Sequence, residues 1–98
     1  MTINQVLNGT ELTLSPEGRL DTTTAPELEA VLKDSLGGVT ALVIDMKNLD
    51  YISSAGLRVL LQAQKTMNVQ GEMTVTNAND MIKEIFEVTG FADILTIK

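Results

Sequence analysis

The pattern of apolar and polar positions predicts a strand pair at the start of the chain. Over residues 3–20, apolar and polar residues alternate on either side of Asn8-Gly9, a dipeptide suited to a tight turn. This alternation predicts a β-hairpin. The residues expected to point into the core are Ile3, Val6, Leu12 and Leu14.

A helix is predicted within residues 22–38. Thr24 and Glu27 have the spacing of a capping box, and Pro26 suits the first helical turn. Gly37-Gly38 would end the helix. Its apolar stripe would consist of Leu28, Val31, Leu32 and Leu36.

The rest of the chain alternates between strand and helix. Residues 40–46, TALVIDM, form a nearly continuous apolar run of the kind found in strands buried on both faces. Helical spacing of apolar residues predicts helices over residues 56–67 and within 78–90. Residues 71–77 and 93–98 are predicted strands.

This order of elements predicts a single α/β domain over residues 1–98. A hairpin followed by alternating helices and strands favours a small mixed β-sheet, with the N-terminal hairpin and parallel strands packed against α-helices. The 98 residues are too few for two cores, and a hydrophobic content of 44% is sufficient for one.

Composition and charge narrow the possible functions. The formal net charge of −6 disfavours binding to nucleic acid. The chain has no Cys and no His, which removes thiolate nucleophiles, imidazole bases and the commonest zinc ligands. No signal-peptide pattern and no membrane-spanning apolar run is present, so we expect a cytoplasmic protein without membrane insertion.

Motifs for catalysis, metals and cofactors are weak. The sequence has no phosphate-binding GxxxxGK[ST] loop, and DMKNLD, with Asp45 and Asp50, lacks the central glycine of a calcium loop. It is interpreted as a solvated turn. Ser54-Ala55-Gly56 superficially resembles a nucleophile elbow, which requires a histidine that this chain does not have. We therefore expect neither a cofactor nor a metal.

The stretch YISSAGLRVLL, residues 51–61, places small residues before the most apolar helix. Ser53 or Ser54 could cap that helix, which would be a purely structural role. However, Leu57 stands where a capping-box Glu would follow Ser54, and Gly56 costs up to about 1 kcal/mol of helix stability. Small residues here would leave a serine hydroxyl uncovered for another protein or for a phosphate.

Together, LDYISSAGLRVLL, the preceding ALVIDM and the upstream GRLDTTTAPEL resemble the STAS domain of bacterial anti-sigma factor antagonists, over essentially the whole chain. The resemblance implies the fold predicted above and a regulatory protein that is not an enzyme. Such an antagonist, when unphosphorylated, binds an anti-sigma factor serine kinase and releases the sigma factor. Phosphorylation by that kinase switches binding off, and a serine phosphatase restores it.

The resemblance also assigns residues. The family's phosphoacceptor falls on Ser54, two residues before Gly56-Leu57, and its acidic loop residue falls on Asp21. The implied partner-binding surface consists of Asp21, Thr22, Thr23, Thr24, Ser53, Ser54, Ala55, Gly56 and Arg58.

Three positions depart from the family pattern. Antagonists often have Asp before the phosphoacceptor, Ser or Thr after it, and Gly after the motif's Leu, where this chain has Ser53, Ala55 and Arg58. Ser53 is therefore a second, less favoured acceptor. Arg58 could pair with a phosphate or with an acidic residue of the partner.

Two alternative functions stay open, the first implied by the STAS resemblance and the second by the residues themselves. The first is a STAS adaptor without a phosphorylation switch, in a lipid-transport or chemosensory complex. The second is an enzyme of carboxylate or hydroxyl chemistry, for which Asp21 or Asp45 would be required.

Overall fold

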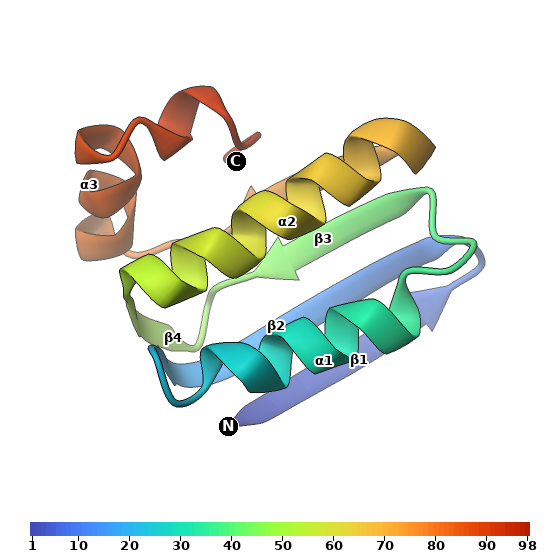
Figure 1. The fold of residues 1–98 in the computed structure, drawn as a ribbon, viewed down its shortest axis with the longest axis horizontal. Helices are drawn as coiled ribbons and strands as arrows, with labels where there is room; N and C mark the ends of the chain where they lie inside the picture. Colours follow the sequence, from blue (N-terminus) through green and yellow to red (C-terminus); the bar gives the residue numbers. More distant parts are fainter.

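One mixed β-sheet carries two helices, α1 and α2, side by side across one of its faces (Figure 1). The computed structural model describes residues 1–98. Its strands are β1 (Thr2–Asn8), β2 (Glu11–Leu20), β3 (Ala41–Asp45), β4 (Leu49–Ile52) and β5 (Glu72–Thr76). Its helices are α1 (Ala25–Ser35), α2 (Ser54–Gln70) and α3 (Asp80–Val88), followed by a 3-10 turn, η1 (Phe91–Asp93).

The sheet has the predicted mixed topology. The strand order is β1-β2-β3-β5, and β4 pairs with the end of β2. Strands β1 and β2 are antiparallel, whereas β2 and β3, β3 and β5, and β2 and β4 pair in parallel. The α/β fold and the N-terminal hairpin are therefore confirmed.

The prediction that Val6 points into the core is wrong. Val6 lies opposite Thr13, on the face of the sheet that carries no helix, and is 61% exposed. Leu12 and Leu14 are buried beneath the helices, and Ile3 packs against the same core. Side chains alternate between the two faces of a strand, so Ile3 and Val6, three positions apart, cannot share one face.

Strand β3 is buried on one face only. Leu42 and Ile44 are buried, while Ala41, Val43 and Asp45 between them are half-buried. The sequence prediction of burial on both faces is wrong, because α1 and α2 cover only one side of the sheet (Figure 1).

The chain differs from the predicted elements in the middle and at the end. Helix α2 begins at Ser54 and extends to Gln70, and the unpredicted strand β4 occupies part of the expected turn. Residues 93–98 do not form a strand. They form one isolated bridge, in which the N–H of Val75 donates to the Thr96 carbonyl and that of Lys98 donates to the Val75 carbonyl.

Candidate functional site

The two segments singled out in the sequence meet where β2 and β4 end. Leu20, the last residue of β2, pairs with Ile52, the last residue of β4. The N–H of Ser53 then donates to the Leu20 carbonyl across 2.9 Å. Because Asp21 follows Leu20 and Ser54 follows Ser53, the acidic loop and the start of α2 are adjacent.

Asp21 organises the loop over residues 21–24. Its Oδ1 accepts hydrogen bonds from the Thr23 hydroxyl at 2.8 Å, the Thr23 N–H at 3.0 Å and the Thr24 N–H at 3.2 Å. The Thr24 hydroxyl donates to the Arg19 carbonyl at 2.7 Å and accepts from the Asp21 N–H at 2.9 Å. These bonds hold the loop in one conformation.

The predicted capping box at Thr24 and Glu27 is wrong. Thr24 does precede α1, but its side chain makes no cap hydrogen bond because its hydroxyl is engaged within the Asp21 loop. Glu27 instead accepts from the N-terminal amine at 2.9 Å. Pro26 occupies the first turn as predicted.

The hydrogen bonds of the loop stabilise the ionised form of Asp21. The Thr23 hydroxyl contributes most and, with the N–H groups of Thr23 and Thr24, outweighs the opposing effect of desolvation. The pKa of Asp21 is therefore below its ordinary value of 3.8. At neutral pH the loop presents a fixed negative charge beside the start of α2.

The loop should loosen only in acid. A folded-state pKa below the unfolded value stabilises the fold above pH 3.8, and this contribution is lost as the pH falls through the lowered pKa. We expect the Thr23 amide resonance to titrate with a midpoint below 3.8, and Asp21→Asn to remove that titration. A midpoint at or above 3.8 would contradict the assigned role of these hydrogen bonds.

The two adjacent serines are in different environments. Ser54 is exposed in the first turn of α2, whereas the Ser53 Oγ is buried and has no hydrogen-bond partner. Neither serine caps α2: Ser53 stands at the cap position without a side-chain cap bond. The capping interpretation is therefore wrong, and only the Ser54 hydroxyl is readily reached from outside.

Gly56 is small because the helix packs closely on the sheet. A Cβ there would lie 2.8 Å from Leu20 Cγ and 2.8 Å from Ile52 Cγ1. Gly56 itself is buried, so its lack of a side chain serves this packing. The sequence interpretation gave the small residues the role of leaving a serine uncovered. It did not foresee that Gly56 is required by its contact with Leu20 and Ile52, whereas Ala55 is half-buried beside the exposed Ser54.

Other predicted site residues line a shallow cavity between α2 and the start of α1 with the loop that precedes it. Thr22, Ala55 and Arg58 contribute to its walls, and its volume is about 200 Å³. Arg58 is exposed and forms no ion pair. The remaining lining residues were not predicted to belong to the site: Ala25, Pro26, Glu29 and Val59.

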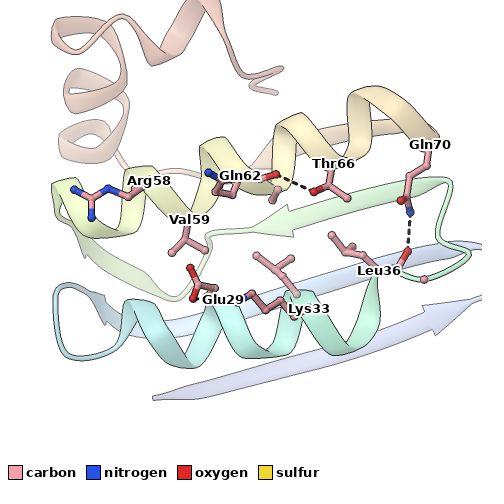
Figure 2. Close-up of a pocket in the computed structure, with 11 residues that line it drawn as sticks. Glu29, Lys33, Leu36, Arg58, Val59, Gln62, Thr66 and Gln70 are labelled. Carbon is pink, nitrogen blue, oxygen red and sulfur yellow. Dashed lines mark hydrogen bonds and ion pairs between the residues drawn. The ribbon is translucent and has the colours of Figure 1, made fainter.

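A longer groove runs from this cavity between α1 and α2 (Figure 2). Its volume is about 560 Å³, and it shares Glu29, Arg58 and Val59 with the smaller cavity. At its far end the Gln70 side chain donates to the Leu36 carbonyl at 2.6 Å. This groove was not predicted from the sequence, although two sets of its lining residues recur at four-residue spacing, which places each set on one face of a helix: Glu29 and Lys33, and Arg58, Gln62 and Thr66.

Arg19 and Tyr51 form a cation–π pair next to the site. The Arg19 guanidinium lies 4.4 Å from the centre of the Tyr51 ring, across the paired ends of β2 and β4. Its Nε is 3.8 Å from Asp21 Oδ2. The Arg19 side chain is 62% exposed, so this cation–π contact lies at the surface next to the loop.

Asp21 and Asp45, the two carboxylates of the enzyme alternative, do not form a joint site. Asp45 accepts from the Lys47 N–H and the Asn77 side chain, and shares no partner with Asp21. No group of three or more acidic side chains is placed to hold a metal ion. None of the helices combines the length and apolar character needed to span a membrane.

Comparison with known proteins gives consistent matches. The family model described as the STAS domain matches residues 2–98. BtrV of Bordetella bronchiseptica is 40% identical over 83 residues, covering 83% of this chain and 72% of BtrV. The anti-sigma-B factor antagonist of Staphylococcus aureus (strain NCTC 8325) is 32% identical, covering 82% of this chain and 76% of that protein.

Solved structures share the fold. The Bacillus cell fate determinant SpoIIAA in its phosphorylated form aligns with a TM-score of 0.77 at 16% identity, covering 99% of this chain and 91% of SpoIIAA. At that identity the likeness concerns the fold alone. It extends over the whole arrangement of sheet and helices described above.

Proposed function

The chain belongs to the STAS-domain family, and on that premise we propose that it is an anti-sigma factor antagonist acting in the cytoplasm. In this proposal the unphosphorylated protein binds an anti-sigma factor serine kinase and thereby releases the sigma factor. The kinase phosphorylates Ser54, which ends binding, and a serine phosphatase restores the active form. The protein itself performs no catalysis.

The single observation that carries the proposal is the exposed Ser54 hydroxyl beside the ordered, negatively charged Asp21 loop. A kinase needs a hydroxyl that it can reach, and a binding partner needs a surface of fixed shape. The Staphylococcus aureus relative is named an anti-sigma-B factor antagonist, and SpoIIAA is described in both unphosphorylated and phosphorylated forms. These names support the proposed class and the proposed chemistry.

A phosphate on Ser54 would not unfold the domain. It would place about −1.5 to −2 charges at the N-terminus of α2, where the helix dipole favours anions. No side chain caps the first turn of α2, and that turn contains no acidic residue. Arg58 follows Ser54 by one helical turn and is exposed, so it can approach the phosphate.

The switch would instead act at the interface. We place the kinase against the loop at Asp21–Thr24 and the start of α2 at Ser53–Arg58. A doubly charged group there loses its hydration against a kinase surface that offers it no donor. Arg58 and the helix N-terminus compensate that loss only in part, so it costs several kcal/mol, and each 1.4 kcal/mol weakens affinity about tenfold. A local charge is therefore sufficient to release the partner without a change of fold.

The acceptor assignment can be tested by mapping the phosphate. With the anti-sigma factor kinase of the same organism, Ser54→Ala should abolish phosphorylation, because the Ser53 hydroxyl is buried. Ser53→Ala should still be phosphorylated, as judged by mass spectrometry of the peptide that contains both positions. Undiminished phosphorylation of Ser54→Ala would disprove the assignment.

A further inference from the structure

Strand β1 forms a free edge of the sheet. It pairs with β2 on one side and with no strand on the other. The opposite edge, formed by β5, is partly paired, because the C-terminal residues 96–98 hydrogen-bond to Val75 in the middle of that strand. The fold therefore covers part of one edge and leaves the other available for pairing.

The free edge lacks the features that usually prevent edge pairing. Charged side chains, proline and β-bulges are the common protections of edge strands. The β1 sequence, TINQVLN, contains no charged residue and no proline, although 20% of the chain is charged. Its register with β2 runs without a bulge from Thr2 to Asn8. Val6 and Leu7 are 61% and 65% exposed.

We propose that β1 pairs antiparallel with β1 of a second copy of this chain, forming a two-fold symmetric dimer with one continuous sheet. Pairing centred on Gln5 uses the whole strand. It places Leu7 opposite the copy's Ile3, on the helix side of the sheet, where Ile3 already packs against its own core. On the open face, Val6 lies opposite the copy's Asn4.

Charge favours this edge as the contact between two acidic copies. Each chain has a net charge of −6, so two copies repel overall, and the repulsion at the contact is smallest where the meeting surfaces carry no charge. In the proposed register Thr2 lies opposite the copy's Asn8. Because Glu17 pairs with Thr2 and Glu11 pairs with Asn8, Glu17 and the copy's Glu11 would be three strand spacings apart, about 14 Å. That distance exceeds the Debye length of about 8 Å at physiological ionic strength, so the repulsion is largely screened.

The dimer would leave the Ser54 site open. Ser54 follows β4, and β4 pairs with the C-terminal end of β2. The same end of β2 lies next to Thr2, so the Ser54 site lies toward the N-terminal end of β1. The two-fold axis turns the strands antiparallel, so the two Ser54 sites would lie at opposite ends of the joined sheet. Self-association and kinase binding are therefore separate properties, and failure of one would not imply failure of the other.

Sedimentation velocity tests the proposed dimer. Over about 5 µM to about 500 µM, which brackets the affinity expected of a small interface, the wild type should shift from monomer to dimer. Leu7→Lys and Val6→Lys should each weaken self-association at least tenfold, because a lysine on the edge opposes pairing. Val69→Lys makes the same change at a site 90% exposed on α2 and should dimerise as the wild type does.

Cross-linking tests the register. The chain has no Cys, so Gln5→Cys carries a single thiol. Directly paired strands bring opposite Cα atoms to about 4.5–5.5 Å, within disulfide range, so oxidation should yield a covalent dimer. Val69→Cys should not cross-link comparably. The proposal would be overturned by a wild type that stays monomeric, by open-ended polymers, or by lysine variants on β1 that dimerise normally.

Discussion

Replacing Gly56 by valine should lower the free energy of unfolding by about 3 kcal/mol, the upper part of the usual range for overpacking a core. The first added carbon would meet Leu20 Cγ and Ile52 Cγ1 at 2.8 Å each, and Leu20 Cδ2 at 3.0 Å. Leu20 and Ile52 are 0% and 1% exposed and have no space to move aside. Urea denaturation followed by circular dichroism measures the change.

Two controls identify the cause of that loss. Lys65→Val, on an exposed position of α2, should change stability by no more than about 0.5 kcal/mol. Leu20→Ala alone should cost about 2–5 kcal/mol through the cavity it leaves. Combined with Gly56→Val, it should cost less than the sum of the two changes, because the valine fills that cavity. Strict additivity would show that Gly56 is not constrained by Leu20.

Ser54→Asp should weaken capture of the anti-sigma factor kinase at least about 100-fold, equivalent to about 2.7 kcal/mol. The carboxylate would occupy the exposed first turn of α2 and lose its hydration in the proposed interface, where the kinase offers no donor to pair with it. Ser54→Ala should bind nearly as the wild type does, since it removes only a hydroxyl. Isothermal titration with the purified kinase compares the three affinities.

The control for this loss is an equal charge elsewhere on α2. Val69→Asp adds one carboxylate at a position 90% exposed, about 22 Å along the helix from Ser54. It should bind the kinase as the wild type does. Equal weakening by Ser54→Asp and Val69→Asp would indicate a general charge effect and would contradict a local switch.

The architecture could be predicted where local patterns determine it. Pro26 and the apolar residues Leu28, Leu32 and Leu36 indicate α1, and the structure confirms them. Strand β4 has only four residues, too few for an alternating pattern to emerge, and its pairing depends on a register shift between Gly18 and Arg19 of β2. Such a shift is a property of the assembled sheet.

The residues of the candidate site could be recognised in the sequence, but their exposure and packing could not be predicted from it. Ser54 and Asp21 are recognisable in the sequence, and the structure places their segments side by side. The difference between Ser53 and Ser54 depends on how β4 ends against Leu20, and the reason for Gly56 depends on the same distant residue. Contacts between residues far apart in sequence therefore decided which serine is accessible.

The central claim, that phosphorylation of Ser54 ends kinase binding, is tested most directly with the modified protein itself. The chain is prepared with phosphoserine incorporated at position 54 and compared with the unmodified chain in titrations against the purified anti-sigma factor kinase. We predict at least about 100-fold weaker binding of the phosphorylated chain, with an unchanged circular dichroism spectrum. Equal affinities of the two forms would contradict the account.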